Sequence, residues 1–183
     1  VTGLGLGAHL EHWGYAAEKV KELYWDEQMT LTPGMTITAT TSRHFSGRLL
    51  KRNTTLWCSF VLKSSSASLF LGGDSGYGPH FKAIGDTYGP FDLAILENGQ
   101  YNASWRNIHL MPDEILHAYS DLQAKALLPV HSSKFSVANH DWDEPLSLVS
   151  KNAKAKNIPV LTPRIGEINY LNQHQEFDEW WKD

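Results

Sequence analysis

Three short apolar runs, each followed closely by a polar side chain, constrain the fold of this chain more than any other feature. The runs and their polar groups are Leu69-Phe70-Leu71 before Asp74, Leu93-Ala94-Ile95-Leu96 before Glu97-Asn98, and Leu127-Leu128-Pro129-Val130 before His131. Runs this short and apolar are typical of strands buried on both faces of a sheet that helices cover. Ligands of such sheets bind beyond the carboxyl ends of the strands, so we expect these polar groups to converge there.

The segments between these runs alternate between strand and helix patterns. We expect strands at 34–40, 56–63, 68–71, 91–96 and 126–130, near Val160 and at 167–171, and helices at 79–84, from Pro112 and at 145–156. The serine run 64–66 predicts a hairpin turn, and Gly85 is expected to stop the helix before it. Pro112 and the acids after it predict the clearest helix, with Ile115, Tyr119 and Leu122 on one face. The pattern predicts an α/β fold with a mixed β-sheet flanked by helices.

Length and composition exclude several classes of protein. The 183 residues predict a single domain, 1–183, and no apolar run approaches the ~20 residues of a membrane-spanning helix. The net charge is −4 and no run of Lys and Arg exceeds two residues, so we expect no nucleic-acid partner. The single cysteine, Cys58, fits a reducing cytoplasm, and a cytoplasmic location is the expectation.

With one cysteine, any metal site has to use histidines and carboxylates. His44 follows a predicted strand, and His131 and Asp74 follow two others, so these three residues form a candidate site for zinc. A histidine at a strand end is more often a hydrogen-bonded structural group than a ligand, and Asp74 could equally bond its own turn. The residues alone leave both interpretations open.

Two other motifs do not meet the requirements of their sites. The run GLGLGA at 3–8 matches a dinucleotide-binding fingerprint, but only Val1 and Thr2 precede it where a strand is required. The run HLEH at 9–12 lacks the HExxH spacing of a zinc-binding helix. Trp180 and Trp181 are expected to pack a C-terminal tail against the domain.

Several further motifs, taken in order, resemble one family. They are GLGAHLEHWG (5–14), TSRHFSGR (41–48), LWCSFVL (56–62), GGDSGYGPHF (72–81), FDLAILENGQY (91–101), HLMPDE (109–114) and LLPVHSSKF (127–135). Together they resemble the metallo-β-lactamase superfamily, in the branch of the N-acylphosphatidylethanolamine-hydrolysing phospholipase D and RomA-like bacterial proteins. The similarity extends over nearly the whole chain.

The resemblance implies a hydrolase with two zinc ions, in which a metal-bound hydroxide attacks a phosphodiester, phospholipid-like or ester substrate. It implies that His44, Asp74 and His131 are metal ligands. It also implies that His109 is a catalytic group in the substrate cleft, as a proton donor or a substrate contact. Ser46, Asn98 and Tyr101 stand within the matched motifs and are the expected substrate-binding residues. The implied partner is a small-molecule or lipid-like substrate.

The chain departs from the family pattern in one respect. The motif HxHxDH, which supplies four ligands in the family, does not occur in these 183 residues. We therefore expect the C-terminal part of an αββα sandwich, inactive alone, with zinc bound weakly or not at all. The sheet face that the other half would cover should drive self-association. The alternative is a non-catalytic binding or scaffold domain that kept the fold and lost the metal site.

Overall fold

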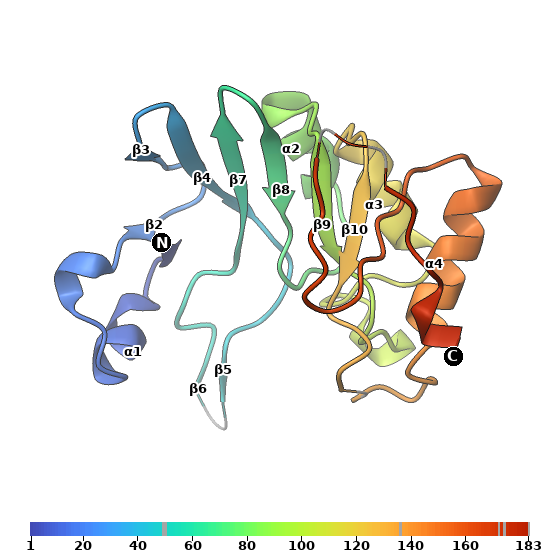
Figure 1. Cartoon of the computed structure of the whole chain (residues 1–183). Helices are drawn as coiled ribbons and strands as arrows, with labels where there is room; N and C mark the ends of the chain where they lie inside the picture. The colour runs from blue at the N-terminus through green and yellow to red at the C-terminus, as the bar shows by residue number, and fades with distance from the viewer. Residues whose placement is uncertain (49–50, 136, 172, 174, 183) are drawn as a thin grey trace.

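A six-stranded mixed sheet forms the centre of the computed structural model, which describes residues 1–48, 51–135, 137–171, 173 and 175–182. The strand order is β10-β9-β8-β7-β4-β3. Strands β10, β9 and β8 run parallel, whereas β8–β7, β7–β4 and β4–β3 are antiparallel pairs. The predicted α/β fold with a mixed sheet flanked by helices is confirmed (Figure 1).

The elements have the following bounds. The strands are β1 Thr2–Gly3, β2 Glu22–Leu23, β3 Gln28–Thr32, β4 Met35–Thr41, β5 Gly47–Arg48, β6 Lys51–Arg52, β7 Cys58–Ser64, β8 Ser68–Leu71, β9 Leu93–Glu97 and β10 Leu127–Val130. The helices are α1 Gly7–His12, α2 His80–Tyr88, α3 Glu114–Asp121 and α4 Glu144–Ala155, with short 3₁₀ turns at Ala17–Lys19, Ala103–Trp105 and Trp180–Lys182. No helix in the described part of the chain has both the length and the apolar character needed to cross a bilayer.

One face of the sheet packs against the helices and forms the main core. Alternate residues of the strands, such as Val61, Phe70 and Ala94, join Phe81 of α2 and Ile115 of α3 in this core. Because side chains alternate along a strand, the same strands present a second set of residues to the other face. The predicted hairpin at residues 64–66 is confirmed, since β7 pairs antiparallel with β8 across it.

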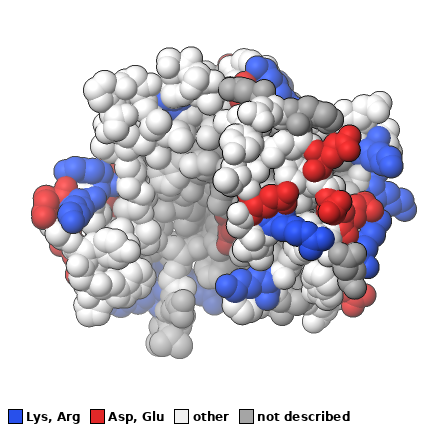
Figure 2. Space-filling view, in the orientation of Figure 1, with Lys and Arg blue, Asp and Glu red and all other residues white. Residues whose placement is uncertain are grey.

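The second face of the sheet carries a continuous apolar row. Ala39, Phe60, Leu71, Ile95 and Leu128 are cross-strand neighbours from β4 to β10, and all of them except Ala39 are only partly buried. In Figure 2, the area over the middle of the sheet shows almost no blue or red atoms. This side of the sheet is therefore apolar, and no helix of the described residues covers it as α2 and α3 cover the other side (Figure 1).

The helix predicted at 79–84 does not stop at Gly85. Helix α2 extends from His80 to Tyr88, with Gly85 buried inside it. A Cβ on this glycine would lie 2.0 Å from the backbone oxygen of Asp121 at the end of α3. The expectation that Gly85 ends the helix was wrong. This glycine allows α2 and α3 to approach closely, and such a contact between distant helices leaves no signal in the neighbouring sequence.

The C-terminal region differs from the expectation in one element and agrees in another. Residues 167–171 form turns and irregular chain instead of a strand, and Val160 makes only a single parallel bridge to Leu127. Trp181 is 2% exposed and its Nε1 donates to Ser147 of α4, so the predicted packing of the tail is confirmed. Figure 1 shows the tail crossing in front of β9 and β10 before it reaches α4.

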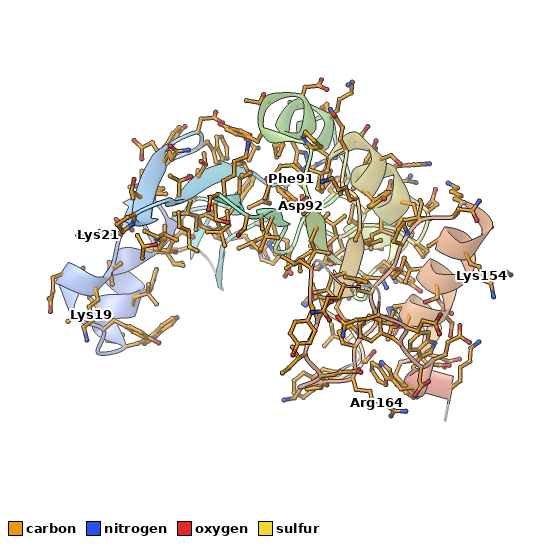
Figure 3. All side chains as sticks on the ribbon, turned by 45° about the horizontal axis from the view of Figure 1, so that its top comes forward. Lys19, Lys21, Phe91, Asp92, Lys154 and Arg164 are labelled. Atoms are coloured by element: carbon orange, nitrogen blue, oxygen red, sulfur yellow. The ribbon has the colours of Figure 1, made fainter. Side chains whose placement is uncertain are left out.

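Basic side chains are spread over both ends of the molecule. Figure 3 places Lys19 and Lys21 on the N-terminal segment, and Lys154 and Arg164 on the opposite side, on α4 and the C-terminal segment. Phe91 and Asp92 lie between these ends, just before β9.

Candidate metal centre

Asp74 stands beyond the carboxyl end of β8 because two glycines turn the chain there. A Cβ on Gly72 would lie 2.9 Å from the backbone oxygen of Ile95, and Gly73 has a left-handed φ of +61°. Because glycine has no side chain, Gly72 can approach the Ile95 backbone and Gly73 can adopt the left-handed conformation without steric cost. The turn places the carboxylate of Asp74 at the edge of the sheet, with 38% of its side chain exposed.

Two histidines from other loops face the same carboxylate oxygen. Nε2 of His44 lies 3.9 Å from Oδ2 of Asp74, and Nε2 of His131 lies 3.6 Å from it. The three residues that the sequence predicts as a site are therefore brought together. They come from loops after β4, β8 and β10, as expected for groups beyond strand ends.

His131 adopts an unusual backbone conformation. Its φ is +67°, in the left-handed region that non-glycine residues seldom occupy. A Cβ on Gly99 would lie 2.3 Å from the backbone oxygen of His131. The loop after β9 therefore needs a glycine at position 99. Strain of this kind often occurs at functional sites.

Arg43 fixes the loop that carries His44. Its guanidinium donates to the backbone oxygen of Tyr77 and to Oδ1 of Asn107, at 2.9 and 2.7 Å. Its backbone N–H donates to Oγ of Ser75, the residue after Asp74. The His44 and Asp74 loops are therefore joined directly to one another.

A buried histidine–glutamate pair lies next to these three residues. Nδ1 of His109 is 2.9 Å from Oε2 of Glu97, which is 1% exposed, and the backbone N–H of Leu110 donates to Oε1 of Glu97. Burial lowers the pKa of His109, but the hydrogen bond and charge of Glu97 outweigh this effect and raise it. Burial raises the pKa of Glu97, against the opposing hydrogen bond from His109.

Sequence reasoning placed Glu97 at a strand end but gave it no role. The signal was present, because a charged residue directly after an apolar run is seldom buried without a partner. Its partner, His109, lies beyond the loop that follows β9 and is not predictable from spacing. The ring of His109 stacks at 5.7 Å on that of His131 and meets that of His44 edge-on at 5.4 Å.

These side chains form donor sets that fit a divalent metal ion. Single donor atoms of His44, Asp74 and His109 all lie within 4.8 Å of one another, as do those of Glu97, His109 and His131. Imidazole nitrogens and carboxylate oxygens are ligands that zinc accepts. These histidine and carboxylate donors can therefore hold a hard-to-borderline divalent cation such as zinc.

The three expected substrate-binding residues lie in different surroundings. Ser46 lines the same hollow as His44 and Asp74, and its Oγ donates to the backbone oxygen of Thr55. Asn98 is buried and its amide donates to the backbone oxygen of Pro145. Tyr101 is also buried, with its hydroxyl donating to Oε1 of Glu144 at the start of α4.

The fold and this cluster define an α/β domain of the metallo-hydrolase type, with donors gathered beyond the strand ends. The family model described as "Beta-lactamase superfamily domain" matches residues 1–132, and the chain belongs to that family.

Curated relatives agree with the branch that the motifs indicate. The chain is 56% identical over 100 residues to outer membrane protein RomA of Klebsiella pneumoniae, across 55% of this chain and 76% of that protein. It is 36% identical to an uncharacterised protein of Mycobacterium tuberculosis, across 98% of this chain and 49% of that protein. It is also 36% identical to the mitochondrial N-acyl-phosphatidylethanolamine-hydrolyzing phospholipase D of Saccharomyces cerevisiae, across 70% of this chain and 29% of that protein.

The fold also matches solved structures. Igni18, a metallo hydrolase from Ignicoccus hospitalis, superimposes with a TM-score of 0.67 at 18% identity, across 87% of this chain and 63% of that one. The chain spans about half the length of the mycobacterial relative that it matches.

Proposed function

We propose that this chain contributes part of the active site of a zinc-dependent hydrolase, with His44, Asp74 and His131 as metal ligands. One observation carries the proposal: Nε2 atoms of two histidines, from separate loops, lie within 3.9 Å of the same oxygen of Asp74. A domain with no metal to bind has no chemical need for this convergence. Membership of a family that includes metal-dependent hydrolases supports it.

Each residue would have a distinct task. When bound, zinc would act as a Lewis acid and lower the pKa of water. His109 lies beside the ligands and would contact the substrate or supply a proton, while Glu97 holds its Nδ1. Because Nδ1 is engaged, Nε2 is the nitrogen that remains for that task.

The three proposed substrate contacts differ in how readily they reach the site. Ser46 lines the hollow beside His44 without any rearrangement, although its Oγ is hydrogen-bonded to the backbone of Thr55. Asn98 and Tyr101 would first have to leave their hydrogen bonds to Pro145 and Glu144. Ser46 is therefore the contact that we expect to matter most for substrate affinity.

For the substrate we propose a phosphodiester of the phospholipid type, or an ester. The support is the similarity to the yeast protein named for N-acyl-phosphatidylethanolamine hydrolysis. Three ligands from this chain do not complete a site for two zinc ions, and the motif HxHxDH is absent from its sequence. We propose that the chain alone is inactive and acts with a segment that supplies those ligands.

A hydrolysis assay on the complete gene product and on this chain tests the proposal. The substrates are N-acylphosphatidylethanolamine in mixed micelles and a chromogenic phosphodiester. We expect zinc-dependent turnover by the complete product, a loss of at least ~10³-fold in Asp74→Asn, and background rates for the chain alone. His117→Ala, at an exposed position of α3, is the matched control and should retain full activity.

The opposite outcome has a clear meaning. If the zinc-loaded complete product turns over neither substrate, or if Asp74→Asn retains activity, the hydrolase proposal is wrong. The scaffold interpretation then replaces it.

A further inference from the structure

The structure adds a fourth donor, His109, to the three that the sequence indicates. We propose that His44, Asp74 and His109 together bind one zinc ion in this chain by itself, with His109 oriented by Glu97. The inference rests on the metal role proposed above for His44 and Asp74, and it changes the role of His109. In a complete site Nε2 of His109 would face the substrate. In this chain, which has no HxHxDH motif, the same nitrogen would bind the zinc ion.

Geometry supports this set of three. One donor atom from each of His44, Asp74 and His109 lies within 4.8 Å of the other two. Ligands at ~2.0–2.1 Å from a tetrahedral zinc ion are about 3.4 Å apart, so small side-chain rotations close the site. The rings of His44 and His109 are in edge-on contact, with their centroids 5.4 Å apart, so the two imidazoles already lie side by side.

The buried carboxylate of Glu97 gives His109 the arrangement of a metal ligand. Histidines that bind metals almost always donate their other ring N–H to a carboxylate or a carbonyl, which fixes the tautomer and the orientation. Glu97 accepts from Nδ1 of His109 and from the backbone N–H groups of Leu110 and Ser75. Nε2 of His109 is thereby left for the cation.

The same hydrogen bonds argue against the other donor set. Glu97, His109 and His131 also satisfy the distance criterion, but the Glu97 oxygens already accept several hydrogen bonds. Glu97 therefore positions a ligand and does not bind the cation itself. Nε2 of His131 also lies 3.6 Å from Oδ2 of Asp74, but His131 does not share a donor set with His44, and we expect it to contribute less to this ion.

Metal titration of the 183-residue chain tests the inference without any assay of activity. Chelator-treated protein is titrated with Zn²⁺ in a calorimeter and with Co²⁺ by visible absorption. We expect one ion per chain, at least ~10-fold weaker binding in His109→Ala, and a 10- to 100-fold loss in Glu97→Gln. His131→Ala should lose less affinity than His109→Ala, and His117→Ala should bind like the unaltered chain.

Two results with the variants overturn the inference. One is a His109→Ala chain that binds zinc as tightly as His117→Ala, and the other is a larger loss in His131→Ala than in His109→Ala. His109→Asn provides a second variant, and far-UV circular dichroism confirms that each variant is folded. Absence of zinc binding by the unaltered chain also overturns it.

These outcomes are distinguishable from failure of the proposed function. If His131 and not His109 governs binding, the ligand set His44, Asp74 and His131 stands and only the role of His109 changes. If the unaltered chain binds no zinc, the hydrolase proposal is still decided separately by the assay of the complete gene product.

Discussion

Nε2 of His131 lies 3.6 Å from Oδ2 of Asp74, although the two residues come from loops after different strands. The relationship follows from the parallel order of β8, β9 and β10, which brings the carboxyl ends of these strands to one edge. It is the contact on which the proposed metal centre depends. Without the His131 loop, Asp74 would keep only His44 as a facing imidazole, at 3.9 Å.

The packing of Trp181 predicts that the C-terminal tail is part of the domain. Trp181→Ala removes a side chain that is buried in the main core and should lower the free energy of unfolding by about 3–5 kcal/mol. Urea denaturation measures this change. Trp13→Ala, at a position that is 68% exposed, should change it by less than ~0.5 kcal/mol. Equal effects of the two substitutions would show that the tail does not pack as described.

The contact between α2 and α3 predicts that Gly85 does not tolerate a side chain. A methyl group in Gly85→Ala would meet the backbone oxygen of Asp121, so the helices must separate. We expect a loss of about 1–3 kcal/mol in the free energy of unfolding, although alanine favours helices. Lys82→Ala, on the exposed side of α2, is the control and should lose only ~0.5 kcal/mol with its ion pair to Asp86. A more stable Gly85→Ala chain would contradict this account.

His80 predicts a loss of stability in weak acid. Burial, together with the charge of Arg43, lowers the pKa of His80 to about 4 from its ordinary value of 6.5. Between these values the unfolded chain binds a proton that the folded chain does not bind, so the free energy of unfolding falls as the pH falls from 6.5 toward 4. Because the side chain is only partly buried, we expect a contribution of roughly 1 kcal/mol.

The comparison of His80→Gln with the unaltered chain isolates this contribution. Urea denaturation at pH 7.5 and at pH 5 should show a smaller loss in the variant, by that amount. Glutamine still bonds the Ser75 hydroxyl, which His80 Nε2 meets at 3.1 Å. An identical pH dependence in the two proteins would exclude His80 as the cause.

The apolar row on the open face of the sheet predicts self-association of the chain. We propose that a second copy covers Phe60, Leu71 and Ile95, because these cross-strand neighbours form a continuous apolar surface. Sedimentation velocity at micromolar concentration should show a dimer that Leu71→Glu disrupts. Phe135→Glu, which changes an exposed residue outside the row, should leave it intact. A monomer that binds no hydrophobic dye would contradict the proposal.

Sequence patterns predicted the elements whose signals are local. The sequence predicts strands β8, β9 and β10 from their apolar runs, and helix α3 from its apolar spacing and the acidic residue in its first turn, because these signals lie in neighbouring residues. The helix end at Gly85 was misplaced because that glycine responds to a distant helix. Residues 167–171 have a strand composition, but they cross the molecule as irregular chain.

In the candidate site, too, the features with local sequence signals were predictable and those set by tertiary contacts were not. The convergence of His44, Asp74 and His131 was predictable because each follows a strand, and the carboxyl ends of these strands lie at one edge of the sheet. The Glu97–His109 pair was not predictable, because a loop and a 3₁₀ turn decide where His109 lies. The hydrogen bonds of Asn98 and Tyr101 to the start of α4 likewise depend on how that helix packs.

Asp74 belongs to both the expected ligand set and the set proposed for this chain, so its removal tests the metal centre most directly. The measurement is zinc bound at saturation, by equilibrium dialysis and elemental analysis, for the unaltered chain, Asp74→Asn and the control Asp86→Asn on α2. We predict one zinc ion per chain in the unaltered protein and in Asp86→Asn, and none above background in Asp74→Asn. Equal zinc in all three proteins would show that these residues do not form a metal centre.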